Sequence, residues 1–412
     1  MQPVRLTCKV EPITPQEFDL KSLPDGFYDD PFPTYRRLRT EAPIKVLGDG
    51  GYLLTRHADL VEVYRNTRSF SSDKRAQFAP VFGEGSPLYE HHTTSLVFND
   101  PPLHTHVRRA IGNALSNRMV EVLRTDLEDL VGGLLDDLDT ADSFDLIADY
   151  AARIPVEIIG NMLRIPREAR GPLRRWSLAI LGSLEVSADD EVLRRGHEAV
   201  SEFLAFLEAF VSRHRERMTD DEDDILSRLL RWRAGDYRLD GAELYHQCIF
   251  LLNAGHETTT NLIGNSVDLL FRYPDILQQL QAEPDLIDSA IEEFLRFESP
   301  NQLGNRTTTQ EVVLGDQLIP AGTILTLCIG AANRDPEVFV EPEILKIDRD
   351  PNPHLSFGSG IHTCAGLNVA RLEARVAILR LIERFPGLSK AGPALHARRA
   401  RFRGFETLPA RP

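Results

Sequence analysis

The sequence predicts a mainly α-helical fold with small β-sheets, and three observations point to it. Apolar residues recur at three- and four-residue intervals between charged ones over 107–138, 146–162 and 200–218, which is typical of amphipathic helices. A largely apolar run over 240–271, ending before Pro274, indicates a helix that crosses the interior. Short apolar runs bounded by glycine and proline turns indicate strands near the start and in the last third of the chain.

The strands are expected in two places. Residues 44–47 and 52–55 flank the turn Gly48-Asp49-Gly50-Gly51, which predicts a β-hairpin. Residues 312–314, 318–319 and 324–327 alternate with the turn sequences Gly315-Asp316 and Pro320-Ala321-Gly322. These segments predict small sheets beside the helices.

The long apolar helix contains an unusual centre. It opens with Asp240-Gly241-Ala242-Glu243, a capping-box pattern, and later carries a glycine and three consecutive threonines, which are poor helix formers. The hydroxyl of Thr258 can bond the carbonyl of Ala254 four residues earlier, which would open a groove in the helix. Glu257 is costly in so apolar a run unless it has a function or a partner. The alternative is that Glu257 and His256 bond each other or neighbouring helices.

Composition excludes several classes of protein. Hydrophobic residues make up 42% of the chain, and no linker divides it, so one domain over 1–412 is expected. The net charge of -15 argues against nucleic-acid binding. No apolar segment at the start resembles a signal or membrane anchor, which predicts a soluble cytoplasmic protein without membrane attachment. The four cysteines, Cys8, Cys248, Cys328 and Cys364, have no paired spacing, so disulfides are not expected.

The most informative segment surrounds Cys364. A glycine-rich turn ends at this cysteine and precedes a helical pattern over 367–385, so the thiol is expected at a helix N-terminus, where its pKa is lowered. A thiolate is what a haem iron needs for oxygen activation. Gly358 and Gly360 permit positive φ angles and close backbone approach. The alternatives are a buried free cysteine, as we expect for the other three, or a zinc site with His354 and His362, which lacks a Cys-x-x-Cys partner.

Two motifs then carry a resemblance. The cysteine loop resembles the haem-binding signature of the cytochrome P450 family at Phe357, Gly360, His362, Cys364 and Gly366. The pattern Ala-Gly-x-Glu-Thr-Thr over 254–259 is similar to the acid-alcohol motif of the same family. The resemblance extends from about residue 29 to residue 412, leaving 1–28 as an N-terminal tail. It implies the cytochrome P450 fold, with haem between the oxygen-activation helix and the cysteine-loop helix.

The resemblance also implies roles for individual residues. Cys364 would ligate the iron of haem b, and Glu257 with Thr258 would deliver protons during oxygen activation. The two haem propionates need cations or other donors. The residues matching those positions are His104, Arg108, Arg306 and His362. For each of the four, an ordinary surface charge is the alternative. Ala365 departs from the leucine common in relatives, which leaves its effect on the iron open.

Glu293 and Arg296 resemble the buried core ion pair of the family, because they lie three residues apart between the two motifs. Relatives often add an arginine at the position that Ile344 occupies here. The third member of the network is therefore open, with Arg334 or Arg349 as substitutes.

The substrate pocket is expected to be an apolar cavity with a polar handle. Asn253 and Gln302 are the two amides that would contact a substrate oxygen or nitrogen, unless both cap backbone groups instead. The full set of expected pocket residues is Phe78, Phe82, Leu96, Val97, Asn253, Ala254, Gln302 and Phe402.

By this resemblance the protein is a haem-thiolate monooxygenase. It would insert one atom of O2 into a small or medium organic substrate, by hydroxylation or epoxidation. Electrons are expected from a separate ferredoxin and ferredoxin reductase, because no redox domain is fused, and Arg109, Arg371 and Arg375 are expected to face the donor. The alternatives are a peroxide-driven peroxygenase and a non-catalytic haem-thiolate sensor.

Overall fold

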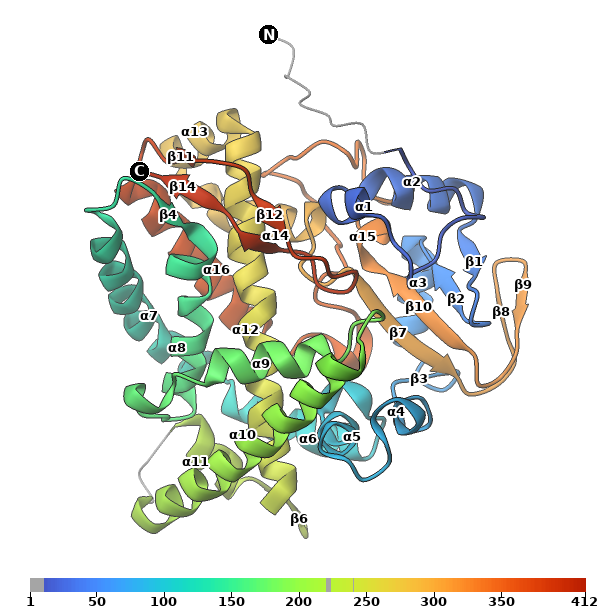
Figure 1. Cartoon of the computed structure of the whole chain (residues 1–412), viewed down its shortest axis with the longest axis horizontal. Helices are drawn as coiled ribbons and strands as arrows, with labels where there is room; N and C mark the ends of the chain where they lie inside the picture. The colour runs from blue at the N-terminus through green and yellow to red at the C-terminus, as the bar shows by residue number, and fades with distance from the viewer. Residues whose placement is uncertain (1–10, 220–223, 240) are drawn as a thin grey trace.

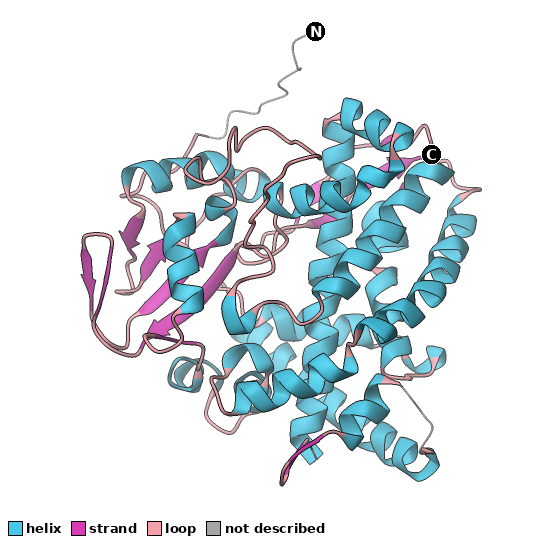
Figure 2. Cartoon of the chain, turned by 180° about the vertical axis from the view of Figure 1, so that it is seen from behind, coloured by secondary structure: helices cyan, strands magenta, loops and turns pink. Residues whose placement is uncertain are grey.

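The computed structural model describes residues 11–219, 224–239 and 241–412. Helices fill most of the molecule, and a sheet with short helices beside it forms one side, as Figures 1 and 2 show. This arrangement confirms the predicted mainly α architecture with small sheets.

The centre of the fold is α12, Gly241–Arg272. Its side chains are buried over most of its length, because α8 (Arg153–Met162), α9 (Leu173–Gly182), α14 (Ile287–Phe297) and α16 (Leu367–Arg384) pack around it. Figure 1 shows α12 running through the middle of the helical part. The predicted interior helix is therefore confirmed, while the expected cap at Asp240 lies outside the described residues.

Two predicted helices are interrupted. The segment 107–138 forms α6 (Leu103–Ala114) and α7 (Asn117–Leu138), because Leu115 leaves helical geometry and Ser116 adopts an extended backbone before α7. Serine is favoured at such a helix start. The segment 146–162 forms a π-helical turn, Leu146–Ala151, before α8. Further α-helices are α1 (Asp25–Asp29), α2 (Phe32–Glu41), α3 (His57–Arg65), α4 (Arg75–Phe82), α5 (Pro87–Thr94), α10 (Asp190–Arg217), α11 (Ile225–Arg231), α13 (Pro274–Ala282) and α15 (Ile329–Ala332).

The largest sheet joins distant parts of the chain. Its order is β1 (Ile44–Val46), β2 (Tyr52–Leu54), β10 (Ile324–Cys328), β7 (Leu303–Thr308) and β3 (Phe70–Ser71). The predicted hairpin is confirmed as β1 and β2, and β10 lies parallel to β2. β7 runs antiparallel to β10 with Arg306 opposite Leu325. Strand β7 brings Arg306 to the edge of the helical part.

Three two-stranded sheets and one three-stranded sheet complete the described β structure. They pair β8 (Val312–Leu314) with β9 (Gln317–Ile319), β5 (Arg233–Ala234) with β6 (Tyr237–Arg238), β12 (Leu395–His396) with β13 (Phe405–Thr407), and β14 (Pro409–Arg411) with both β4 (Phe144–Asp145) and β11 (Ser389–Lys390). The β8–β9 hairpin is the one predicted around Gly315.

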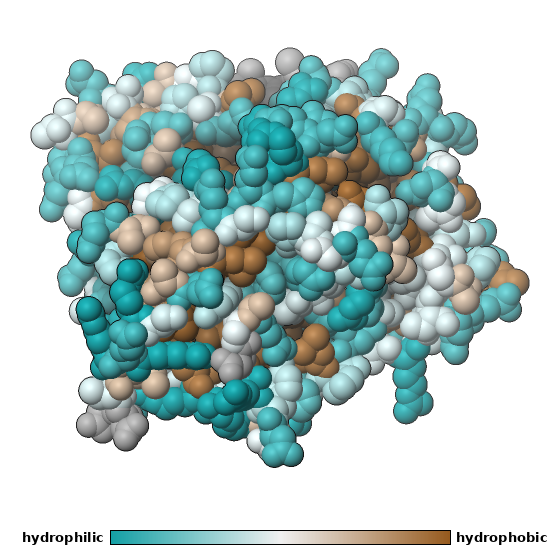
Figure 3. Space-filling model, turned by 60° about the horizontal axis from the view of Figure 1, so that its bottom comes forward, coloured by the Kyte–Doolittle hydropathy of each residue, from teal (hydrophilic) through white to brown (hydrophobic). Residues whose placement is uncertain are grey.

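The segment before residue 29 is more than a tail in its described part. Phe18 and Phe27 are buried, and Phe27 meets Tyr35 edge to face at 5.6 Å between ring centroids. The expectation of a tail over 1–28 is therefore wrong for residues 11–28, since their apolar side chains cover α2. Among the described helices, none is both long and apolar enough to cross a membrane. Figure 3 shows a face on which hydrophilic side chains predominate and apolar ones form separate patches.

Candidate functional site

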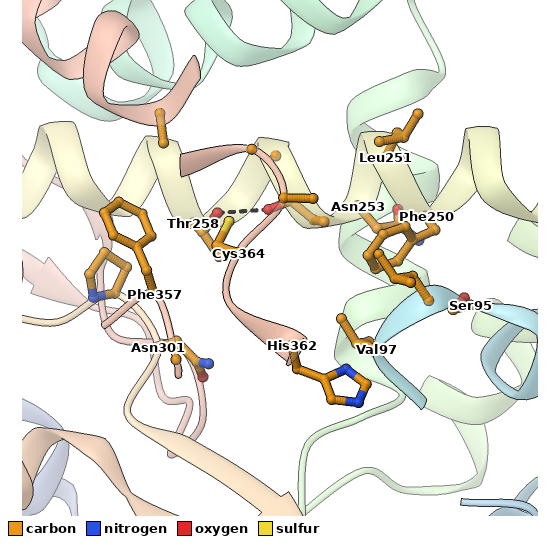
Figure 4. A pocket seen from close by; sticks show the side chains of 18 of the residues that line it. Ser95, Val97, Phe250, Leu251, Asn253, Thr258, Asn301, Phe357, His362 and Cys364 are labelled. Carbon is orange, nitrogen blue, oxygen red and sulfur yellow. Dashed lines mark hydrogen bonds between the residues drawn. The ribbon is translucent and has the colours of Figure 1, made fainter. Parts of the chain in front are cut away.

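A cavity of about 360 Å³ lies between α12, the cysteine loop and β7. Thr258 lines it from α12, Cys364 from the loop before α16, and Arg306 from β7. Figure 4 shows Thr258 and Asn253 on the helix and Cys364 with His362 on the loop that faces it. The two sequence motifs, more than a hundred residues apart, thus share one cavity.

The cysteine loop is fixed by its backbone. The Cys364 N–H donates to the Phe357 carbonyl at 2.8 Å, and Gly358 and Gly360 have φ angles of 69° and 71°. A Cβ on Gly360 would lie 2.6 Å from the Tyr64 carbonyl oxygen, so glycine is needed both for conformation and for space. The close approach is to Tyr64 on α3. The glycines therefore fold the loop so that Cys364 lies three residues before the start of α16.

The protonation of Cys364 differs from the expectation. Burial raises the pKa of its thiol, although the Gly366 amide and the guanidinium groups of Arg108 and Arg371 act in the opposite direction. The predicted lowering by the helix N-terminus is therefore wrong for the protein alone, because desolvation outweighs the nearby donors. A bound metal cation is what would make the thiolate the favoured form here.

Thr258 adopts the predicted bond within α12. Its Oγ1 donates to the Ala254 carbonyl at 2.7 Å, and both residues line the cavity. The hydroxyl oxygen keeps lone pairs that can accept from a ligand. Thr259 also lines the cavity, whereas the Thr260 hydroxyl bonds the His256 carbonyl at 2.9 Å. The groove is therefore bordered by Ala254 and Thr258.

Glu257 has a partner that the sequence did not suggest. Its carboxylate forms an ion pair with Arg399, from the loop between β12 and β13, and it is not among the residues that line the cavity. Burial raises the pKa of Glu257, and Arg399 lowers it in opposition. His256 bonds neither Glu257 nor any other described residue through its ring nitrogens. The Glu257–His256 alternative is therefore wrong.

The expected propionate contacts converge at one end of the cavity. His104, Arg108, Arg306 and His362 all line it, and the rings of His104 and His362 lie 4.2 Å apart. Within the described chain neither arginine forms an ion pair with an acidic side chain. Burial, helped by the neighbouring arginines, lowers the pKa of both histidines, that of His362 to about 2.

These side chains fit a haem. Among the described residues, Nε2 of His104 and Nε2 of His362 are buried without a hydrogen-bond partner, and the Arg306 side chain donates only to the neighbouring Asn305 carbonyl. A group with two carboxylates would satisfy these donors. Cys364 could hold the iron of the same group.

Five of the eight expected pocket residues line the cavity: Leu96, Val97, Asn253, Ala254 and Phe402. Gln302 does not. Asn301 and Leu303 face the cavity, so the residue between them points to the opposite side, where its amide donates to the Ser299 carbonyl at 2.6 Å. The expectation for Gln302 is corrected to its structural alternative.

Phe78 and Phe82 lie one layer behind the cavity. The Phe78 ring meets His92 at 5.6 Å and Phe98 at 5.1 Å between centroids, and Phe82 meets His92 at 5.3 Å. His92 and Phe98 are the residues that line the cavity there. The two phenylalanines therefore support the wall and are not expected to touch a ligand.

The Glu293–Arg296 pair lies fully buried, with both side chains at 0% exposure and Nε to Oε2 at 2.7 Å. Arg349 provides the third member at 3.0 Å from Glu293. Ile344 contributes its backbone carbonyl, which accepts from both arginines, while its side chain is exposed. Arg334 pairs with Glu343 instead.

Glu373 and His91 are two of the polar cavity residues that the sequence did not indicate. Glu373 of α16 is buried, its Oε2 has no hydrogen-bond partner in the described part of the chain, and burial raises its pKa to about 8. Its position four residues after Val369 and three before Val376, on the apolar face, was the available signal. His91 of α5 also lines the cavity. Its neighbour His92 lines the cavity too, and no periodic pattern marked either histidine.

Comparison with known proteins gives a consistent result. The family model described as Cytochrome P450 matches residues 187–390. Vitamin D(3) 25-hydroxylase of Pseudonocardia autotrophica is 38% identical over 370 residues, 89% of each chain. 6-deoxyerythronolide B hydroxylase of Saccharopolyspora erythraea is 33% identical, over 95% of this chain and 98% of the relative. The crystal structure of P450BioI with an acyl carrier protein ligated to hexadec-9Z-enoic acid is 31% identical, with a TM-score of 0.88 over 94% of this chain and all of that one.

Proposed function

The chain belongs to the cytochrome P450 family, and from that premise we propose that it inserts one atom of O2 into a small or medium organic molecule with electrons from a separate ferredoxin-type donor. The protein is a monooxygenase of that family, and its cofactor is haem b with a cysteine ligand. The observation that carries the proposal is the placement of Cys364 and Thr258 in the walls of one largely apolar cavity. Haem bound there would supply the activation of dioxygen and the transfer of one oxygen atom.

The protein side chains would then divide the remaining work. Cys364 is the candidate iron ligand, and His104, Arg108, Arg306 and His362 are the candidate propionate contacts. Phe357, Gly360 and Gly366 shape the loop around the sulfur. The donors without partners among the described residues support the propionate contacts. The close packing of Gly360 on Tyr64 supports the role of the loop.

Proton delivery is assigned to Thr258 and Glu257. The Thr258 hydroxyl donates to Ala254 and retains acceptor capacity toward the cavity. Glu257 sits one residue away, held by Arg399, and would take protons from solvent when that pair opens. Leu96, Val97, Ala254 and Phe402 would supply the apolar contacts that exclude water from the substrate.

The electron donor is proposed to be a ferredoxin that a ferredoxin reductase reduces. Of the three expected surface cations, Arg371 already pairs with Glu292 and Arg375 with Asp288. Arg109 is exposed and has no ion pair with a described side chain. We therefore assign the electrostatic contribution mainly to Arg109, and Arg109→Glu should slow the first electron transfer at low salt more than Arg375→Glu.

One experiment separates the proposal from its two rivals. The holoenzyme with a surrogate ferredoxin and ferredoxin reductase should consume NADH and O2 faster when a binding substrate is added, and should form an oxygenated product. A peroxygenase would form product with hydrogen peroxide and gain nothing from the electron donors. A sensor would bind the ligand without product under either condition.

A further inference from the structure

Most of the cavity wall around the substrate space is apolar, and two neighbouring uncharged polar side chains interrupt it on the side of α5. Asn253 of α12 and His91 of α5 both line the cavity, and they are exposed by only 4% and 2%. Their neighbours in the wall include Leu96, Phe250 and Leu251. Figure 4 shows Asn253 beside Phe250, on the part of α12 away from Thr258.

These two side chains leave hydrogen-bonding capacity unused. Nδ2 of Asn253 lies 3.4 Å from Nε2 of His91, and this is the contact that joins them. The Asn253 Oδ1 and the His91 Nδ1 are both buried without a partner among the described residues. Buried polar atoms are almost always satisfied, so an unsatisfied pair at a cavity wall indicates a group supplied by a ligand.

The chemistry of the missing group follows from the protonation of His91. Burial lowers the pKa of His91 well below its ordinary value, with His92 and His246 adding to the effect, so the ring is neutral. With the Asn253 N–H donating to Nε2, the ring proton resides on Nδ1. The spot therefore offers one donor, His91 Nδ1–H, and one acceptor, Asn253 Oδ1.

We propose that Asn253 and His91 together recognise an alcohol hydroxyl on an otherwise apolar substrate. A hydroxyl donates one hydrogen bond and accepts others, so it matches both groups at once. An ether or ketone would leave Asn253 Oδ1 unsatisfied, and a carboxylate would bring a charge to a wall that has no cation at this spot. This inference rests on the proposed monooxygenase function and names the substrate class for the same cavity.

The position of the pair also predicts where the substrate is oxidised. Asn253 precedes Thr258 by five residues, which is on the order of 7 Å along a helix axis. The hydroxyl is therefore held away from the reacting end of the cavity. Oxidation is expected at a carbon remote from the hydroxyl, not at the carbon that carries it.

The test compares matched probes in the ferric holoenzyme. Adamantane, 1-adamantanol and adamantane-1-carboxylic acid, and likewise dodecane, 1-dodecanol and dodecanoic acid, are titrated while the low-to-high-spin Soret shift is followed. Two hydrogen bonds should favour at least one alcohol over its hydrocarbon by about tenfold. Asn253→Leu, and separately His91→Phe, should reduce that preference to within about twofold of unity.

A matched control is available on the same helix. Gln247 is a buried amide that does not line the cavity and donates to the Thr94 carbonyl at 2.7 Å. Gln247→Leu should keep the alcohol preference. Each variant is first checked for the reduced CO band of thiolate-ligated haem. If Asn253→Leu loses haem, Asn253→Ala takes its place.

Several outcomes would overturn the inference. They are equal binding of hydrocarbon and alcohol, no Soret shift with either alcohol, or a preference that survives both substitutions. Tightest binding of the acids, lost in Arg401→Gln, would instead assign the polar contact to Arg401, which lines another part of the cavity. A wild-type protein without the thiolate CO band would reject the proposed function itself, which is a separate result.

Discussion

The guanidinium of Arg399 forms an ion pair with the carboxylate of Glu257 in the centre of α12. The pair ties the helix that carries Thr258 to the loop between β12 and β13, and it opposes the rise that burial imposes on the pKa of Glu257. Glu257 is therefore held in an ion pair whose two charges cancel, until its contact with Arg399 opens.

Replacing Arg399 with glutamine should raise the pKa of Glu257, because the opposing cation is lost while burial remains. The carboxylate form, which accepts protons from solvent, would then be populated only at higher pH. The acid limb of product formation should move upward in pH. Arg398→Gln, which removes a surface pair with Asp25, is the control. An unchanged pH profile in Arg399→Gln would contradict the relay.

Thr258→Ala should uncouple electron use from product formation. The variant keeps Cys364 and the propionate contacts, so haem binding should be unaffected. Without the hydroxyl, NADH oxidation should continue while hydrogen peroxide replaces much of the product. The neighbouring Thr259→Ala should stay close to wild type. Glu257→Gln should instead slow turnover overall, by about 100-fold. The measurements are the product-to-NADH ratio and peroxide released; equal tight ratios in both threonine variants would refute the assignment.

Cys364→His should abolish the red-shifted Soret band of the reduced CO complex, since that band reports thiolate ligation. Cys248 is buried elsewhere in α12 and does not line the cavity, so Cys248→Ser should keep the band. Retention of the band in Cys364→His would mean that another group ligates the iron.

Glu373→Gln should change how stability depends on pH. The pKa of Glu373 is raised to about 8 from an ordinary value of 4.5, so between these limits the unfolded chain is ionised while the folded protein keeps its proton. Stability is then lost as pH rises, by at most about 1.4 kcal/mol per pH unit. The glutamine variant should lack this loss. Urea unfolding of the holoenzyme at pH 6 and pH 8 compares the two slopes, and parallel slopes would argue against a buried neutral Glu373.

Arg296→Met should destabilise the fold by about 3 to 5 kcal/mol, because it leaves Glu293 charged and buried with one partner fewer. Arg349→Met should also be destabilising, since its Nε contacts Glu293 at 3.0 Å. Arg380→Met removes a pair with Glu383 at the surface and should cost no more than about 1 kcal/mol. Chemical denaturation ranks the three variants, and a mild effect in Arg349→Met would exclude it from the core network.

Features that depend on residues close together in the sequence were predictable, and features that depend on distant residues were not. The long helix, the first hairpin and the Thr258 bond to Ala254 depend on residues close in sequence, and all three were predictable from periodicity and turn chemistry. Gln302 was misplaced because an extended segment places successive side chains on opposite faces, and the sequence did not show which face turns to the cavity.

The remaining differences arise from contacts across the fold. Arg399 lies 142 residues after Glu257, and no local pattern marks it as a partner. Phe78 and Phe82 are apolar and lie a few residues before the segment that lines the cavity, but His92 and Phe98 separate them from the ligand space. The depth at which a residue is buried also decides that the pKa of Cys364 is raised, and this depth is a property of the packed molecule.

The pairing of β2 with β10 has a consequence for how the protein folds during synthesis. Tyr52 aligns with Leu325, so the two strands are separated by about two thirds of the chain. The sheet cannot close until residues past 328 have left the ribosome, and such non-local pairing slows folding. Until then, β2 has an unpaired edge that can associate with other chains. Aggregation during expression should therefore depend on how well this edge is protected before the last quarter of the protein emerges.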